Sequence, residues 1–171
     1  MYKKIKRNTK LTKRLIRMDF REVKTSLFGF IGGFLTILAL GILTDIINYP
    51  LIMAPFGASC LLVFVAHKSP LAQPKNVILG HLLSSAIGLI MKNVLSTGVV
   101  SLALTVGVVI FLMTLLNIKH PPAGADPIVI FKENLSWDFL ITPVLSGSII
   151  VVLFAIMINN MDKTRKYPIN T

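Results

Sequence analysis

The chain has 171 residues, of which 54% are hydrophobic and 15% charged, and its formal net charge is +11 at pH 7. With a mean hydropathy of +0.75, it carries more apolar surface than a water-soluble domain of this size can bury. The composition therefore excludes an ordinary soluble domain and indicates an integral membrane protein.

Residues 1–25 form a basic arm. Ten of the eighteen Lys and Arg residues precede Ser26, and residues 26–43 then carry no charge. A basic flank beside an apolar run predicts a cytoplasmic N-terminus, with the arm lying as an amphipathic helix on anionic lipid headgroups. The arm is not typical of a secretory signal, because its basic region is too long and no small-residue cleavage site follows. Nucleic-acid binding is not predicted, since no reading motif accompanies the charge.

Four apolar runs follow the arm that have about the 20 residues a membrane-spanning helix needs. They are residues 26–47, 77–95, 96–118 and 139–161. Two shorter runs, 51–66 and 121–131, are interrupted by proline and glycine. Either all six runs cross the membrane or the two short ones are re-entrant and four cross. The loop lysines favour six crossings by three against two, and both topologies place both termini in the cytoplasm.

The two interrupted runs contain the same phrase. "PFGASCLLVF" begins at Pro55, and "PAGADPIVIF" begins 67 residues later at Pro122. The alternative interpretation is chance agreement among aliphatic residues. If the phrase marks an internal repeat, the spacing predicts repeat one at 26–95, repeat two at 96–161 and a cytoplasmic tail at 162–171. Three crossings per repeat predict an all-α polytopic membrane bundle of two inverted helix–half-helix–helix repeats.

Each Pro-x-Gly-Ala phrase is typical of a helix that starts inside the membrane. Proline suits the first helical turn, and the first amide groups of a helix have no partner within it. Such amides and the positive end of the helix dipole attract an anion. We therefore predict a midplane site for a small inorganic anion, with packed kinks as the alternative. Its predicted residues are Pro55, Phe56, Gly57, Ala58, Ser59, Pro122, Ala123, Gly124, Ala125 and Asp126.

Two histidines are further candidates. His81 and His120 lie in apolar surroundings, where an ionisable side chain is a functional candidate that can carry a proton. The alternatives are a packing histidine at 81 and an interfacial cap at 120. Gln73, Lys75 and Asn76 lie in a proline-rich loop that we expect to fold over the cytoplasmic end and gate it. Ordinary loop polarity, or a Lys75 that reaches the headgroups, are the alternatives.

No sign of an enzyme accompanies these residues. There is no phosphate-binding loop, nucleophile elbow, His-x-x-x-His or cysteine pair, so neither a catalytic site, a metal nor a cofactor is predicted. The lone Cys60 is interpreted as a small buried hydrophobic residue.

Three motifs carry a resemblance to a known family. "APFGAS" at 54–59, "SPLAQPKNVILGH" at 69–81 and "KHPPAGADP" at 119–127 occur in the order found in the HPP family of integral membrane proteins. The resemblance implies four transmembrane helices and, from plant and cyanobacterial members, nitrite transport. Asp126 stands where the family commonly has threonine, and Lys75 where it often has arginine. The aspartate brings the nitrite specificity into question.

The predicted function is transport of a small inorganic anion, nitrite or nitrate, across the cell membrane. The alternative is a membrane sensor or scaffold that does not transport. A homo-oligomer is predicted, because a bundle of this length is thin and neighbouring subunits would help to seal a polar path.

Overall fold

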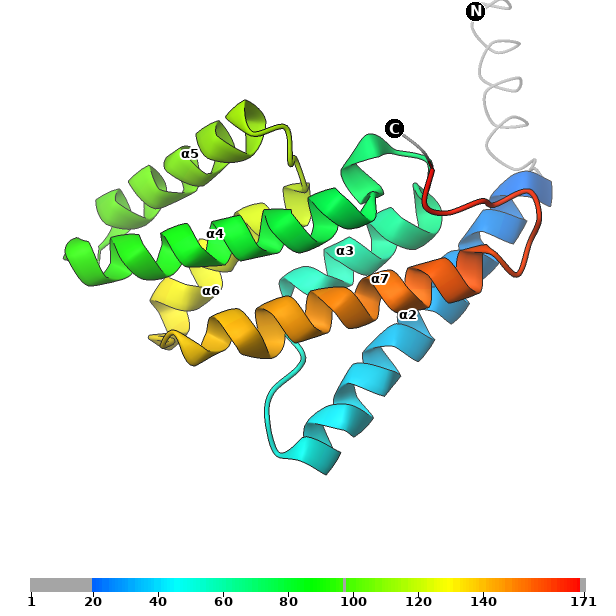
Figure 1. The fold of residues 1–171 in the computed structure, drawn as a ribbon, viewed down its shortest axis with the longest axis horizontal. Coiled ribbons are helices and arrows are strands. Elements are labelled where there is room, and N and C mark those ends of the chain that lie inside the picture. The colour runs from blue at the N-terminus through cyan, green and yellow to red at the C-terminus, as the bar shows by residue number, and fades with distance from the viewer. Residues whose placement is uncertain (1–19, 97, 170–171) are drawn as a thin grey trace, which may run out of the picture.

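A computed structural model describes residues 20–96 and 98–169, and in these residues it contains helices and connecting loops but no strand. The α-helices are α2 (Phe20–Ile47), α3 (Pro55–Val65), α4 (Pro74–Val94), α5 (Val99–Leu115), α6 (Asp126–Glu133) and α7 (Ser146–Asn159). Three short helical segments accompany them, namely η1 (Pro70–Ala72), η2 (Pro121–Ala125) and η3 (Leu140–Leu145). The predicted all-α fold class is confirmed (Figure 1).

Proline and asparagine set several helix ends. Proline occupies the first turn of α3, α4 and η2, where a missing amide hydrogen costs no intrahelical bond. Asn48 and Asn117 follow α2 and α5 with φ of 54° and 52°, and Asn134 caps α6 with φ of 53°. Asparagine tolerates this left-handed conformation better than most residues, which is why the chain can turn there.

Three helical stretches are long and apolar enough to cross a membrane: Phe20–Ile47, Pro74–Val94 and Leu140–Asn159. This supports a membrane protein, although two helices do not have the bounds of the apolar runs. Helix α2 begins at Phe20, before the predicted domain boundary at 26, and residues 1–19 of the arm lie outside the described chain. Helix α5 has only 17 residues, because the turn at Asn117 ends it before the predicted residue 118.

The last predicted span is interrupted near its start. Within Leu140–Leu145 the backbone leaves the helical region at Thr142, where φ is −128° and ψ is 119°. Pro143 follows, and proline cannot donate the hydrogen bond that would continue a helix. The regular part of this span therefore begins at Ser146.

Helix α4 lies in the middle of the bundle and packs against α5, α6 and α7, whereas α2 packs against α3 and α7 (Figure 1). The start of α2 and the end of α7 meet at one end of the molecule, where Lys24 pairs with Asp162. Hydrogen bonds from Lys24 and Thr164 hold the pKa of Asp162 below its usual range. The two ends of the described chain therefore lie together.

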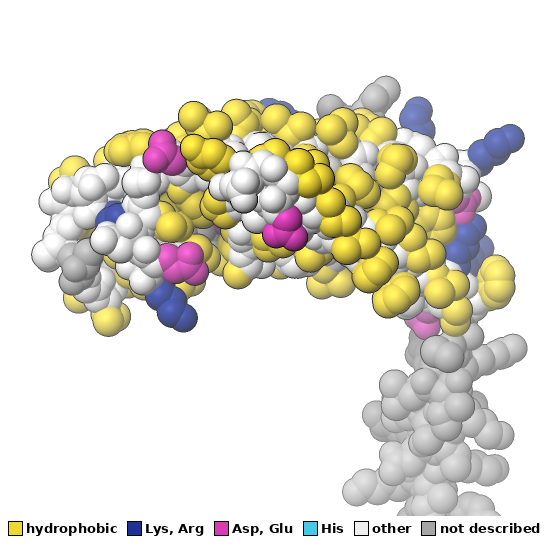
Figure 2. Space-filling view, turned by 90° about the horizontal axis from the view of Figure 1, so that it is seen from below, with side chains coloured by type: hydrophobic (Ala, Val, Ile, Leu, Met, Phe, Trp, Pro, Cys, Tyr) yellow, Lys and Arg dark blue, Asp and Glu magenta, His cyan; other side chains and the backbone are white. Residues whose placement is uncertain are grey.

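The outer surface is largely apolar. Figure 2 shows hydrophobic side chains over most of one face, with Lys and Arg gathered towards the two ends. Phe30 is 70% exposed and Val99 is 85% exposed. A surface of this kind is unfavourable in water and favourable in lipid, so the outward residues of α2 and α5 match a bilayer.

Two glycines allow close approach between the long helices and the short ones. A Cβ on Gly80 of α4 would lie 2.7 Å from the Cβ of His120, and a Cβ on Gly147 of α7 would lie 2.8 Å from the carbonyl oxygen of Leu51. These two glycines are 67 residues apart, the spacing of the repeated phrase. Gly80 thus leaves room for the residue that precedes η2, and Gly147 leaves room for the loop that precedes α3. In each case the short segment belongs to the other half of the sequence.

Candidate functional site

A chain of buried polar side chains crosses the centre of the bundle. Ser59 Oγ lies 2.9 Å from His81 Nε2 and 2.9 Å from His120 Nε2. On the far side of the imidazole, His81 Nδ1 lies 2.9 Å from Asp126 Oδ2. His120 Nδ1 lies 2.8 Å from the carbonyl oxygen of Leu71. The four side chains, Ser59, His81, His120 and Asp126, are completely buried, and we call them the central network.

One face of α4 supports the central network. His81, Ser84 and Ser85 are three and four residues apart, so they share a face of the helix. Ser85 donates a hydrogen bond of 3.0 Å to Asp126 Oδ2, and Ser84 donates one of 2.6 Å to the carbonyl oxygen of Ala123. Sequence analysis missed both serines, although their spacing from His81 was a signal that could have found them.

Aromatic packing fixes the orientation of the two imidazoles. The Phe56 ring meets the His81 ring edge-on, with centroids 5.3 Å apart, and the His81 and His120 centroids are 5.0 Å apart. Phe56 is completely buried. Its ring packs against the central network, whereas sequence analysis predicted Phe56 as a residue of the anion site.

The order Ser59, His81, Asp126 has the connectivity of a serine-hydrolase triad, in which histidine bridges the nucleophile and a carboxylate. Hydrolysis also needs a substrate cavity at the serine and donors for an oxyanion. Ser59 is completely buried, and its hydroxyl contacts a second imidazole, that of His120. The arrangement suits proton exchange along the chain better than attack on a substrate.

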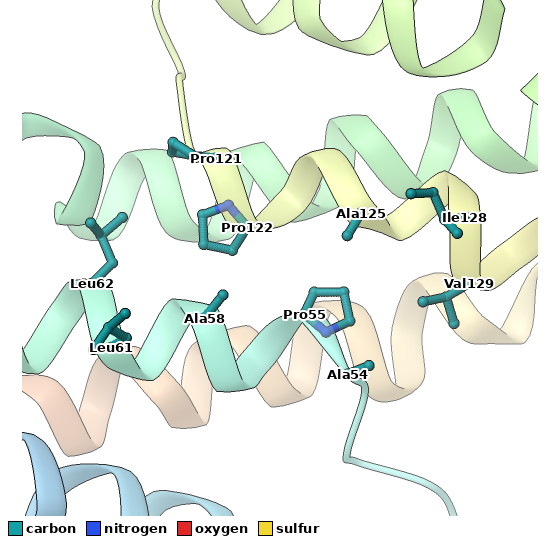
Figure 3. A pocket seen from close by; sticks show the side chains of 10 residues that line it. All are labelled: Ala54, Pro55, Ala58, Leu61, Leu62, Pro121, Pro122, Ala125, Ile128 and Val129. Atoms are coloured by element: carbon teal, nitrogen blue, oxygen red, sulfur yellow. The ribbon is translucent and has the colours of Figure 1, made fainter. Parts of the chain in front are cut away.

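The two Pro-x-Gly-Ala segments do lie side by side, and a cavity of about 690 Å³ separates them (Figure 3). The two segments run in opposite directions, so that Pro55 lies towards Val129 and Pro122 towards Leu62. Pro55 and Pro122, which mark the two helix starts, lie near each other in the middle of the row of lining residues in this view. All the lining residues are apolar: Ala54, Pro55, Ala58, Leu61, Leu62, Pro121, Pro122, Ala125, Ile128 and Val129.

The expectation of unpaired amides at the helix starts was wrong for three of them. The amides of Phe56 and Gly57 donate to the carbonyls of Met53 and Ala54, at 3.0 and 3.2 Å. The amide of Ala123 donates to the carbonyl of His120 at 3.0 Å. Turns that precede each helix satisfy these groups, so they are not available to an anion in the way the sequence suggested.

A second cavity, of about 370 Å³, reaches the central network. His120 and Gly124 line it, together with the exposed cation Lys119. Its other lining residues are Leu71, Val106, Ile110, Met113, Thr114 and Pro121. This cavity, which we call the Lys119 cavity, is where a charged group and a member of the central network border the same space.

The predicted loop residues lie apart from the central network. Gln73 donates to the carbonyls of His67 and Ser69 at 2.9 and 2.8 Å, and Asn76 donates to the carbonyl of Pro70 at 2.9 Å. Lys75 is exposed. Gln73 and Asn76 shape the loop that contains η1, and this loop reaches the site only through the Leu71 carbonyl. Across residues 20–96 and 98–169, no group of three or more His, Cys, Asp or Glu side chains is placed to hold a metal ion.

Comparison with known proteins places this architecture in a family. The family model described as "HPP, transmembrane region" matches residues 18–168. The chain is 36% identical over 126 residues, 69% of its length, to a transmembrane protein of Dictyostelium discoideum, and 33% identical over 166 residues, 90% of its length, to another from the same organism. It spans 44% and 52% of these relatives, and no solved structure matches it. The chain belongs to the HPP family of transmembrane proteins.

Proposed function

We propose that this protein transports a small inorganic anion, nitrite or nitrate, across the cell membrane. The observation that carries the proposal is the central network, which is buried in a lipid-facing bundle and borders the Lys119 cavity through His120. Ionisable side chains are costly within a membrane and usually mark ion or proton pathways. Nitrite enters the proposal only from the resemblance of the motifs to plant and cyanobacterial members of the family.

The packing of the helices is consistent with an inverted repeat, the architecture of many secondary transporters. Both halves of the chain have a long, a short and a long helical segment. Helix α2 packs against α7 as α5 packs against α4, and α3 packs against α7 as α6 packs against α4. Gly80 and Gly147, which are 67 residues apart, follow the same pattern. Gly80 lies against His120 from the second half of the sequence, and Gly147 lies against Leu51 from the first half. This exchange of partners is what a twofold relation between the halves predicts.

The Lys119 cavity supplies the attraction for an anion in this proposal, in place of the helix starts. Lys119 is exposed and lines this cavity, and a cation at the edge of a cavity raises the local concentration of anions. The apolar cavity between α3 and α6 then forms the less polar part of the path.

Anion uptake into proteoliposomes that contain only this protein tests the proposal. Lys119→Gln should lower nitrite uptake at subsaturating concentrations, because the cation at the cavity is removed. Lys132→Gln is a matched control, since Lys132 is also exposed but lines neither cavity. Equal uptake by both variants would reject the role of the Lys119 cavity. Nitrite binding without any uptake would favour the alternative function of sensor or scaffold.

A homo-oligomer is also part of the proposal. Only 17% of the most apolar stretch of helix α2 is buried within one chain, so a long apolar face remains for lipid or for a second copy. Cross-linking in native membranes, followed by mass measurement, distinguishes the two. Detection of monomers alone would remove this part of the proposal without affecting transport.

A further inference from the structure

The hydrogen-bond donors of the central network can be assigned from its contacts. A carbonyl oxygen can only accept, so the Nδ1 of His120 that faces Leu71 carries a hydrogen. If Asp126 is ionised it can only accept, so the Nδ1 of His81 also carries a hydrogen. In two neutral imidazoles, both Nε2 atoms are then acceptors. Both of them point at one hydroxyl, that of Ser59.

Ser59 has one hydroxyl hydrogen, for which the carbonyl oxygen of Pro55 at 3.3 Å also competes, and it therefore cannot satisfy both imidazoles. With Asp126 ionised and both histidines neutral, one of the two 2.9 Å contacts of Ser59 would join two lone pairs. One additional proton completes the chain. It can reside on Asp126, with His81 donating through Nε2 to Ser59 and Ser59 donating to His120. Alternatively, Asp126 stays ionised and His81 carries hydrogens on both nitrogens, with the same two donations.

We propose that the central network binds one transported proton, shared between Asp126 and His81, and releases it through Ser59 and His120. Both completed arrangements have a net charge of zero, whereas the chain without the extra proton has a charge of −1. A neutral network costs far less to bury in a membrane than an uncompensated carboxylate. The inference deepens the proposed function, on which it rests, by making the anion and the proton travel together.

Among the residues that the structure describes, no neighbouring charged group forms a hydrogen bond that would compensate the negative charge of an ionised Asp126. The titratable groups on the helices packed around the network are Cys60 on α3, Lys75 and Lys92 on α4, and Lys132 and Glu133 on α6, with Lys119 beside His120. Helices α5 and α7 and segment η1 contribute none. Lys92 donates to the carbonyl of Leu135, and Lys75, Lys119, Lys132 and Glu133 are exposed. The hydrogen bonds of the network join no cation except its own imidazoles, so the compensating proton is bound within it.

Release follows the hydrogen bonds towards the Lys119 cavity. Starting from His81 with two hydrogens, Nε2 passes its proton to Ser59 Oγ while Ser59 passes its own proton to His120 Nε2. His120 then carries two hydrogens and gives the Nδ1 hydrogen to an acceptor in the cavity that it lines, breaking its bond to Leu71. The network loses one proton and becomes −1, and the acceptor gains one.

The chemistry of the acceptor defines the substrate class. An anion in the cavity that accepts the proton leaves as its neutral conjugate acid, which can cross the apolar cavity between α3 and α6. Only the anion of a weak acid takes up a proton in this way. The proposed proton transfer therefore favours nitrite, and small weak monobasic acids like it, over nitrate, the anion of a strong acid.

The first test measures protonation and does not depend on transport. The chain has three histidines, so a His67→Gln variant leaves the nitrogen-15 NMR signals of His81 and His120 alone. The full chain in bilayers should show one additional proton on the network, as a doubly protonated imidazole or as a protonated carboxyl in the infrared spectrum that Asp126→Asn removes. Two neutral histidines beside an ionised Asp126 across the pH range would overturn the inference.

The second test uses a proton gradient, acidic outside, across proteoliposomes with nitrite outside. Wild type should accumulate nitrite and carry protons inwards with it, while nitrate should not be accumulated. Asp126→Asn imitates the neutral carboxyl, so gradient-driven accumulation should be lost while nitrite exchange persists. Asp138→Asn, a change at an exposed aspartate, is the control and should behave as wild type.

The outcomes separate the two proposals. Gradient-driven accumulation by Asp126→Asn would reject the proton inference and leave anion transport standing. Absence of nitrite flux in wild type would reject the proposed function, and the NMR measurement would still decide whether the network holds the proton. If Asp126→Asn does not fold, Ser59→Ala provides the same comparison, because it removes the bridge between the imidazoles and leaves the carboxylate in place.

Discussion

Helices α4 and α7 occupy matching places in the two halves of the chain, yet they differ in chemistry. At the 67-residue spacing, His81, Ser84 and Ser85 of α4 correspond to Ser148, Val151 and Val152 of α7. The α4 residues either belong to the central network or support it. In contrast, Val151 and Val152 are buried in the apolar core, and Ser148 donates a hydrogen bond to the carbonyl of Leu145 in its own chain segment. The same helix position holds buried polar side chains in one half and apolar packing in the other.

The short segments differ in the same way. Ser59 and Asp126 stand at the same place in the repeated phrase, and they contact opposite nitrogens of one imidazole, that of His81. The two halves thus meet at a single histidine and present a hydroxyl to one side and a carboxylate to the other. In the proposed repeat, equivalent positions of the two halves come together, and the different residues at those positions make the site asymmetric.

The largest expected effect on stability comes from substitution at His81, with Ser148, the residue 67 positions later, as its comparison. His81→Phe keeps an aromatic ring but removes the imidazole that joins Asp126 to Ser59, and breaking a buried charged pair costs about 3 kcal/mol or more. Ser148→Ala loses a bond within its own segment, worth about 1 kcal/mol. Unfolding titrations in detergent measure both. Equal losses would mean that α4 and α7 are equivalent in energy as well as in position.

The glycines test the matching itself. Gly80→Ala and Gly147→Ala place a methyl group against His120 and Leu51, and overpacking of this kind costs about 1–3 kcal/mol. Gly57→Ala and Gly124→Ala meet nothing within 4 Å and serve as matched controls from the repeated phrase. Thermal unfolding should separate the two pairs. A loss confined to one member of the first pair would argue against a twofold relation.

A smaller effect is expected from the tail, which extends from the second half to the first. Tyr167 donates a hydrogen bond of 2.7 Å to the carbonyl of Ala72, so Tyr167→Phe should cost about 1 kcal/mol. Burial raises the pKa of Tyr167, so its contribution is present below the ordinary tyrosine pKa and is lost as pH rises above about 10. Unfolding measured against pH should show that wild type loses this advantage over Tyr167→Phe in alkali.

The smallest effect is expected at the ion pair between Lys24 and Asp162. The pKa of Asp162 is lowered, so any stabilisation exists above its ordinary pKa and disappears as pH falls. Exposed ion pairs contribute little, because water and salt screen them. Lys24→Gln should leave thermal unfolding at neutral pH unchanged. A clear loss of stability would show that the chain ends are joined more firmly than this contact suggests.

The sequence by itself determined the membrane class, the helical architecture and the candidate residues. Long apolar runs beside a basic flank have few structural solutions, because hydrocarbon requires every backbone group to be paired. His81, His120, Ser59 and Asp126 were also identifiable, since ionisable or repeated residues stand out against apolar surroundings. The face shared by His81, Ser84 and Ser85 was readable from helical spacing but was missed.

Only the tertiary structure decided how these residues meet. The prediction of free amides at the helix starts was wrong for Phe56, Gly57 and Ala123, because the preceding turns supply carbonyl acceptors that no spacing rule reveals. The bridging of two histidines by Ser59 depends on α3, α4 and the start of η2 approaching one another, which Gly80 permits. Side-chain contacts between segments 22 and 61 residues apart depend on packing in three dimensions, and local sequence does not encode that distance.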